Sequence, residues 1–374
     1  MSGLYIHIPY CHSKCAYCDF YSTPRADTVP AYIDAMIEEL RMRKDEISSE
    51  PLTTIYLGGG TPSSLPVSQL AKLMEAIGHS FDTSSVIETT IEVNPEDVTP
   101  EFLKDVKALG FNRVSMGVQS LSDTELQAVG RRHTAEEALT AIGLVASAFK
   151  NYNVDIIFGL PYQTLGSLTS TLDRILTFRP PHVSAYLLSY EPGTRLYAAL
   201  MASKVREISD SEAEEMYSYV SSRLNQAGYC HYEISNYALP GYRSRHNSAY
   251  WKLKPYLGLG ASAHSFDGDI RRYNPSSIKS YIEAINAGKC CYIIDEEADW
   301  QKFNDMILVS LRTSDGILLS SLESWPERFA VDFMSQLQPL ISGGNVINDN
   351  GAIKIPQEKW LTSNAVMREL ILSY

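Results

Sequence analysis

The chain lacks a surplus of basic residues and any long apolar run. Its 374 residues carry 32 Lys and Arg against 44 Asp and Glu, a formal net charge of −12. Because sequence-independent binding to nucleic acid requires clustered Lys and Arg side chains, we expect no nucleic-acid partner. No apolar stretch approaches the roughly 20 residues that cross a bilayer, and residues 1–10 show no basic and apolar leader. We therefore expect a cytoplasmic protein.

Cysteine is scarce and unevenly placed. Only six occur, and three of them, Cys11, Cys15 and Cys18, stand in the string CHSKCAYC at residues 11–18. Thiols crowded in this way more often hold a metal or do redox work than form a disulfide framework. No fourth cysteine lies nearby. The string therefore predicts a metal centre with an incomplete set of protein ligands.

Strand-like apolar runs alternate with helical patterns in the first half of the chain, which indicates repeated βα units and a parallel sheet. The expected strands are 4–8, 53–59, 86–93, 113–119, 153–160 and 182–188. The expected helices are 30–46, 67–78, 100–109, 122–129, 134–148 and 166–177. Since we find no further units to close a barrel, we predict an α/β fold, a partial (β/α)6 TIM-like barrel with its site at the carboxyl ends of the strands.

The alternation stops after about residue 190. We expect a partial barrel, a region that covers it and a small C-terminal domain, at residues 1–190, 191–295 and 296–374. Within the covering region, 211–227 and 276–287 have helical patterns. Residues 229–274 are rich in Tyr, Gly, Ser and Arg, so we expect an ordered loop across the barrel.

The C-terminal region has a different pattern. Helices are expected at 300–313, 326–340 and 362–372, and two short alternating runs flank Asn350 and Gly351. Asn-Gly between such runs is typical of a β-hairpin. Helices followed by a hairpin predict a helical, winged-helix-like domain.

Two kinds of centre fit the three thiols. Three thiolates can hold three irons of a [4Fe–4S] cluster and leave the fourth iron open to a bidentate small molecule. A structural zinc site would instead need four protein ligands, with His7, His12 or a distant cysteine as the fourth. Both alternatives stay open on the residues alone.

Polar residues follow several expected strands, where barrel enzymes place their functional groups. GGGTP at 58–62 leaves a backbone without Cβ atoms, which suits either close approach to a ligand or a plain tight turn. Glu92 and Gln119 end apolar strands and could bind a ligand or cap the next helix. Asp155 lies among apolar residues and needs a partner if buried, and Arg131 could pair with it or with a ligand carboxylate.

The CxxxCxxC spacing after a first strand, with an aromatic residue before the last cysteine, resembles the signature of radical S-adenosylmethionine (SAM) proteins. The longer string YIHIPYCHSKCAYCDFYS at 5–22 is similar to the oxygen-independent coproporphyrinogen III oxidase branch. The resemblance implies a [4Fe–4S] cluster on the three cysteines that reduces bound SAM. It also implies a SAM pocket lined by Tyr5, Gly59, Gly60, Thr61, Glu92, Gln119, Arg131 and Asp155.

Two features separate this chain from the oxidases within that branch. Phe20 stands where oxidases typically carry a fourth cysteine, and the first strand begins without their N-terminal extension. The string HNSAYW at 246–251 resembles the HNxxYW motif of HemW-type haem chaperones, which implies His246 as an axial haem ligand beside Tyr250 and Trp251. From the residues alone, His246 could instead organise a loop. His264 departs from the apolar residue expected in the oxidases, and its role stays open.

The resemblance implies a haem chaperone that binds haem and delivers it to membrane haemoproteins. The first alternative is an enzyme, a coproporphyrinogen III oxidase that converts its porphyrinogen to protoporphyrinogen IX in porphyrin biosynthesis. A second alternative is a scaffold that uses the cluster for dimerisation or sensing. The expected partners are therefore haem or porphyrinogen, a membrane recipient and a second copy of the chain.

Overall fold

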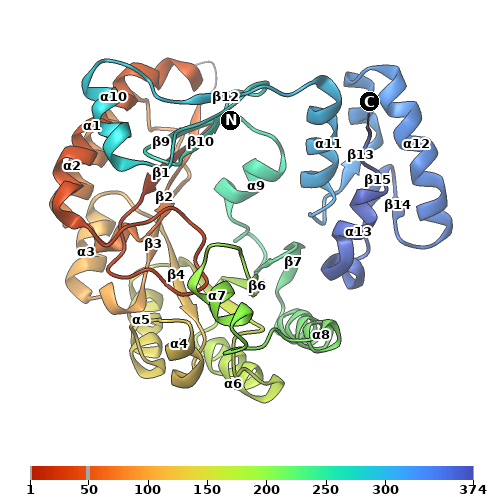
Figure 1. Ribbon diagram of the computed structural model, residues 1–374, viewed down its shortest axis with the longest axis horizontal. Coiled ribbons are helices and arrows are strands. Elements are labelled where there is room, and N and C mark those ends of the chain that lie inside the picture. The colour runs from red at the N-terminus through yellow and green to blue at the C-terminus, as the bar shows by residue number, and fades with distance from the viewer. Residues whose placement is uncertain (1, 48–50, 374) are drawn as a thin grey trace.

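Six parallel strands, paired in chain order, form the centre of the protein (Figure 1). The computed structural model describes residues 2–47 and 51–373. The strands are β1 (Ser2–Ile8), β2 (Leu52–Gly59), β3 (Glu88–Val93), β4 (Arg113–Gln119), β5 (Asn151–Phe158) and β6 (His182–Leu187). They match the six expected strands, which confirms the partial (β/α)6 barrel.

Helices cover the outer side of this curved sheet (Figure 1). They are α1 (Val29–Arg43), α2 (Val67–Ser80), α3 (Pro100–Ala108), α4 (Asp123–Ala128), α5 (Ala135–Ala148) and α6 (Leu165–Leu176). Local chemistry sets their starts: Thr134 accepts a hydrogen bond from the Glu137 amide at 3.2 Å, while Glu137 accepts one from the Thr134 amide at 2.7 Å, a capping box at the start of α5. No helix within the described ranges is long and apolar enough to cross a membrane.

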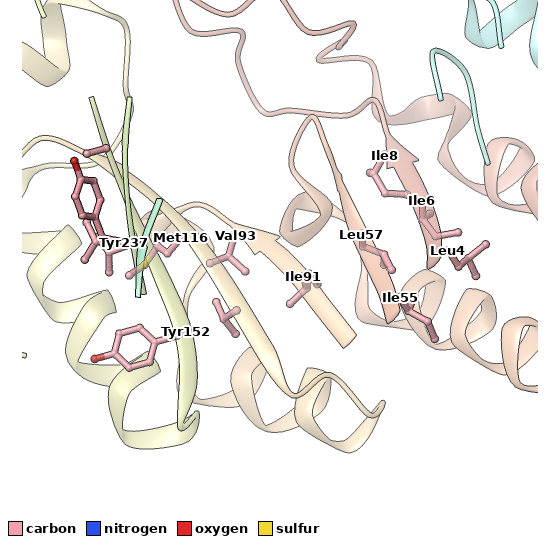
Figure 2. Packing of buried hydrophobic residues seen from close by; sticks show 14 of the residues in the cluster. Leu4, Ile6, Ile8, Ile55, Leu57, Ile91, Val93, Met116, Tyr152 and Tyr237 are labelled. Atoms are coloured by element: carbon pink, nitrogen blue, oxygen red, sulfur yellow. The ribbon is translucent and has the colours of Figure 1, made fainter. Parts of the chain in front are cut away.

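Side chains alternate between the two faces of the barrel strands. Figure 2 shows Leu4, Ile6 and Ile8 of β1, all fully buried in the core beneath the helices. Tyr5 and His7 alternate with them and therefore point into the barrel. Each buried Leu or Ile contributes roughly 1.5–3 kcal/mol, so the outer face holds the helices in place.

The inner face of the barrel is polar. Its side chains include Tyr56, Glu92, Arg113, Ser115, Asn153, Asp155, His182 and Ser184. Asn153 links neighbouring strands, because its amide donates to Ser115 and Ser184 at 2.9 Å and its carbonyl lies 2.7 Å from His182 Nδ1. Parallel strands that are buried on both faces are ordinarily apolar throughout. This polar interior therefore indicates a barrel built to receive a polar ligand.

The expectation of a loop over 229–274 is wrong. The segment forms β7 (Cys230–Glu233), β8 (Asn236–Ala238), α9 (Arg245–Trp251), β9 (Tyr256–Leu259), β10 (His264–Phe266) and β11 (Arg271–Tyr273). With β12 (Ile293–Asp295) these strands extend both edges of the sheet, in the order β12-β11-β10-β9-β1-β2-β3-β4-β5-β6-β8-β7. Strands of three or four residues are too short to show a clear alternation, which is why the sequence pattern misses them.

The rest of the covering region is helical. It contains α7 (Arg195–Met201), α8 (Asp210–Gln226) and α10 (Ile278–Asn286). The last two confirm the helices expected at 211–227 and 276–287. Short 3-10 turns also occur, at Ala26–Thr28, Lys44–Ile47, Pro62–Ser64, Pro95–Asp97, Leu319–Ser324 and Gln357–Thr362.

The C-terminal region has the expected order of helices and hairpin. Its elements are α11 (Asp299–Ser310), β13 (Ile317–Leu318), α12 (Glu327–Ser342), β14 (Ile347–Asp349), β15 (Ala352–Lys354) and α13 (Ser363–Arg368). Asn350 and Gly351 join β14 to β15 with φ of 52° and 87°, as a tight hairpin requires. The last helix is shorter than the expected 362–372. A helix, a strand, a helix and a hairpin in this order fit the winged-helix-like prediction.

A buried ion pair joins α1 to the β9–β10 edge. Arg43 Nη1 lies 2.8 Å from Glu39 Oε1, and the two side chains are almost completely buried. The Arg43 guanidinium also donates to the Gly258 carbonyl at 3.2 Å and to Ser265 Oγ at 3.1 Å. Glu39 accepts from the Gly260 amide at 2.8 Å. The pair therefore ties the first helix to strands more than 200 residues away.

Candidate functional site

A cavity of about 450 Å³ opens at the carboxyl ends of the barrel strands. Its lining includes Cys11, Cys15, Cys18, Gly59, Gly60, Thr61, Glu92, Gln119, Arg131 and Asp155. Residues from five strand ends and the loop after β1 thus meet at one place, as the barrel prediction requires. Of the residues expected in the SAM pocket, Tyr5 alone is not part of the lining.

The loop that carries the three cysteines is held by backbone hydrogen bonds. The Cys11 amide donates to the Thr23 carbonyl at 3.1 Å, and the Ala16 amide donates to the Val129 carbonyl at 2.8 Å. The Ala16 carbonyl in turn accepts from the Leu196 amide at 2.9 Å. The first of these bonds lies within the loop, and the other two anchor the loop at the end of α4 and at the start of α7. Its thiols face the cavity.

The histidines considered for a zinc site have other partners. His12 Nε2 lies 3.2 Å from Asp97 Oδ1, on the surface. His7 is buried, with Nδ1 3.0 Å from the Tyr5 hydroxyl and Nε2 3.3 Å from the Tyr21 carbonyl. Within the described ranges, no three His, Cys, Asp or Glu side chains are grouped closely enough for one metal ion. To complete a four-ligand zinc site with the three thiols, His7 or His12 would have to give up these contacts, whereas a cluster with an open iron needs the thiols alone.

The glycine segment after β2 packs its backbone directly against the end of β1. The Gly60 amide donates to the Ile8 carbonyl at 2.8 Å, and the Thr61 amide donates to the Tyr10 carbonyl at 2.7 Å. A Cβ at position 60 would lie 2.7 Å from both carbonyl oxygens, and Gly59 has a φ of 107°. Both positions therefore require glycine, and they leave a bare backbone edge on the cavity wall.

Glu92 carries a partly buried carboxylate on the cavity wall. The Tyr56 hydroxyl donates to Oε1 at 2.7 Å and the Gly59 amide donates to Oε2 at 3.1 Å. Burial raises the pKa of Glu92 to about 7, and the nearby Asp155 carboxylate acts in the same direction. Tyr5 packs on Tyr56, with ring centroids 6.2 Å apart, and so supports the wall from one layer below. A carboxylate of this kind suits a cationic group.

Gln119 and Arg131 present buried polar atoms without partners. Among the described residues nothing bonds Gln119 Oε1 or Arg131 Nε. Gln119 also has a φ of 68°, a strained value for a residue other than glycine. Arg131 Nη2 donates to Asn94 Oδ1 at 2.8 Å and to the Gly117 carbonyl. Each buried polar atom without a hydrogen-bond partner lowers the stability of the fold by roughly 1–3 kcal/mol. These atoms therefore indicate a polar ligand in the cavity.

Asn94 is a site residue that the sequence reasoning missed. It lines the cavity, and its amide donates to Thr61 Oγ1 at 3.1 Å while its carbonyl receives Arg131. Thr61 Oγ1 is in turn 3.4 Å from Cys11 Sγ. Asn94 therefore links the arginine to the cysteine loop. Its position two residues after Glu92, just beyond the same strand, is the signal that could have found it.

His246 lies away from this cavity. Its side chain is buried, with Nδ1 2.8 Å from Thr54 Oγ1 and Nε2 2.7 Å from the Tyr250 hydroxyl. It stacks on Tyr56 at a centroid distance of 5.0 Å, near the amino-terminal ends of the strands. Burial lowers the pKa of His246 to about 3, so the ring is neutral. Both ring nitrogens are engaged, and haem ligation would require one of these hydrogen bonds to be exchanged.

His264 is also apart from the cavity. It lies on β10, is exposed, and stacks on Tyr273 with ring centroids 5.5 Å apart. It is not among the residues that line the cavity.

Comparison with known proteins agrees with this geometry. The family model described as "Radical SAM superfamily" matches residues 5–175. The haem chaperones HemW of Lactococcus lactis and Bacillus subtilis are each 33% identical to the chain, over 99% and 98% of it and over 97% and 98% of their own lengths. The chain belongs to the HemW family of radical SAM proteins. Coproporphyrinogen III oxidase (HemN) from Escherichia coli superposes with a TM-score of 0.85 at 24% identity, covering 99% of this chain and 90% of that one, which shows a shared fold.

Radical SAM membership implies a [4Fe–4S] cluster and SAM, and the cavity fits both. The three thiols line the same cavity. The glycine backbone leaves room for a ligand, and Gln119 and Arg131 offer polar atoms that have no other partner. When bound, the cluster supplies an electron to SAM. The residues of this chain bind and orient: the cysteines would hold iron, and Glu92 would hold an ammonium group.

The affinity of the cluster-loaded protein for SAM should fall about tenfold from pH 8 to pH 6. Glu92 has its pKa raised to about 7, so it is mostly ionised at pH 8 and mostly protonated at pH 6. The ammonium of SAM needs the ionised form. Isothermal titration at several pH values measures this dependence.

Glu92→Gln should bind SAM weakly at both pH values, with a flat profile. Glu101→Gln, on the exposed surface of α3, is the matched control and should follow the wild-type profile. An unchanged wild-type affinity over this interval would remove Glu92 from the ammonium site.

Proposed function

We propose that this protein is a haem chaperone that binds haem and passes it to membrane haemoproteins. The observation that carries the proposal is the full-length similarity to haem chaperones named HemW, which includes the C-terminal region as well as the barrel. The HNxxYW string is complete in this chain and forms α9. We propose that it works in the cytoplasm, and that a second copy of the chain is a partner.

Position 20 supports the chaperone over the oxidase. Phe20 lies on the rim of the SAM cavity with 68% of its surface exposed. Because this position is Phe, the fourth cysteine typical of the oxidases has no equivalent in this chain. The likeness to coproporphyrinogen III oxidase extends to the fold alone, at 24% identity.

Delivery to a membrane protein would depend on specific contacts. The net charge of −12 gives no general attraction to an anionic membrane surface. We therefore propose that the recipient is recognised through its own protein surface.

We propose His246 as an axial ligand that becomes available when a hydrogen bond is exchanged. Its neutral ring can accept a metal once the hydrogen bond to Thr54 or the one to Tyr250 is given up. The wild-type protein should take up haem with a shifted Soret band. His246→Ala should weaken haem binding at least about tenfold, the loss of one metal–ligand interaction, while binding of metal-free protoporphyrin IX stays the same.

Tyr250→Phe is the matched control for His246→Ala, since it keeps the aromatic packing and removes only the hydrogen bond to Nε2. It should retain haem. The assays need anaerobic, cluster-loaded protein. If the wild type turns over coproporphyrinogen III, the protein is an oxidase. If it takes up no haem but changes its oligomeric state when the cluster is bound or lost, the protein is a scaffold.

A further inference from the structure

A second and larger cavity lies at the opposite end of the barrel from the SAM site. Its volume is about 910 Å³. It is bounded by the starts of β2 and β3, by α9 and the turn after it, and by α11 and β13 of the C-terminal region. In Figure 1, α9 lies between the sheet and these C-terminal elements. A cavity of this size can hold a molecule as large as a cofactor.

The cavity is basic although the chain is acidic. Its lining contains Arg243, Arg245, Lys252 and Lys254 but only one acidic residue, Asp315, a local charge of +3 from four cations less one carboxylate. Asp315 pairs with Arg243 at 3.1 Å and with Lys252 at 3.2 Å. The side chains of Arg245 and Lys254 are exposed and form no ion pair among the described residues, although the Arg245 backbone amide donates to the Glu88 carboxylate at 2.9 Å. Two cations are therefore free to receive anionic groups.

The walls between these cations are apolar and aromatic. Ile87 and Leu318 are 59% and 57% exposed, although the great majority of such side chains in this protein are buried. Trp251 and Met306 add to the apolar lining, together with Ala249, Leu253 and Ile317. The Trp251 Nε1 donor is buried without an acceptor in the part of the chain that the structure describes. Exposed apolar surface beside unpaired cations is typical of a site for an amphipathic anion.

We propose that this cavity binds a tetrapyrrole with two carboxylates, its macrocycle on the Ile87, Trp251 and Leu318 walls and its carboxylates at Arg245 and Lys254. The inference rests on the proposed haem function and deepens it by assigning the binding cavity. The place of His246 supports it: Thr54 lines the cavity and bonds the His246 imidazole at 2.8 Å. The imidazole is thus one side chain behind the cavity floor.

Metal-free protoporphyrin IX is the probe for the cavity, because its affinity does not depend on iron ligation. In the full-length, cluster-loaded protein the double variant Arg245→Glu/Lys254→Glu should raise its dissociation constant at least about tenfold, since two charge-assisted contacts are lost. The dimethyl ester of the same porphyrin has no carboxylates, so its affinity should not change. Leu318→Asp should weaken both porphyrins.

The matched control is Arg41→Glu/Lys279→Glu, which makes the same change in net charge on exposed side chains of α1 and α10. It should bind both porphyrins as the wild type does. If the wild type binds haem and the Arg245 and Lys254 variant binds protoporphyrin IX equally well, the cavity assignment is wrong while the chaperone proposal stands. If the wild type binds neither haem nor protoporphyrin IX, both fail. If the double variant Arg245→Glu/Lys254→Glu no longer binds phosphatidylglycerol vesicles but binds porphyrins as the wild type does, the cavity is a membrane-docking surface and the proposal is overturned.

Discussion

Arg43→Ala should lower the free energy of unfolding by roughly 3–5 kcal/mol, as expected when one partner of a buried ion pair is removed. The change leaves the Glu39 carboxylate buried without its cation, 2.8 Å from the vacated position. It also removes donors from the Gly258 carbonyl and Ser265, so α1 loses its hold on the β9–β10 edge. Urea denaturation followed by circular dichroism measures the loss.

Arg41→Ala is the control for this effect on the same helix. Arg41 pairs with Glu38 at 3.1 Å, but its side chain is 67% exposed, so its loss should cost less than about 1 kcal/mol. The double variant Glu39→Leu/Arg43→Met should not recover this stability, because the Gly260 amide, Asn274 and Tyr281 then lose the Glu39 carboxylate as their buried acceptor. Equal destabilisation by Arg43→Ala and Arg41→Ala would contradict the structural role assigned to the pair.

Cys15→Ala should reduce the iron and acid-labile sulfide of anaerobically reconstituted protein from about four of each per chain to near zero. Cys15 belongs to the three thiols that line the SAM cavity, and Arg131 Nη1 lies 3.6 Å from its sulfur. With two thiols left, too few ligands hold the cluster. Chemical analysis and the visible absorption of the cluster follow the loss.

Cys290→Ala is the matched control, since this thiol is exposed and lies outside the cavity. It should keep its full cluster content. A variant at Cys15 that still binds four irons, or a wild-type protein that binds one tetrahedral zinc through the same sulfurs, would overturn the cluster assignment.

Much of the fold could be predicted because its signals are local. Strand β1 alternates Leu4, Ile6 and Ile8 with inward side chains, and α5 begins at the capping box of Thr134. Similar short patterns mark the other barrel strands and the hairpin at Asn350. The strands of 229–274 escaped prediction because they are short, and because β8 and β9 pair with β6 and β1, which lie far away in the chain.

The candidate site was partly predictable for the same reason. Residues at the ends of parallel strands meet at one edge of the sheet, so Glu92 and Gln119 could be assigned there from the strand pattern. Tyr5 was expected in the lining but supports it from behind, through Tyr56. Whether an inward-facing side chain reaches the cavity or lies behind another residue depends on how its neighbours pack. The order of residues in a strand does not specify this packing.

The spacing of the thiols at residues 11–18, the family and the glycines of residues 58–60 could be read from the chain alone, because each of these depends on neighbouring residues. The location of His246 required the folded chain. Its ring is bonded to Thr54, 192 residues earlier, and is held behind the floor of a basic cavity far from the SAM site. Contacts between such distant segments arise from the curvature of the sheet and the placement of the C-terminal region, so no local pattern can reveal them.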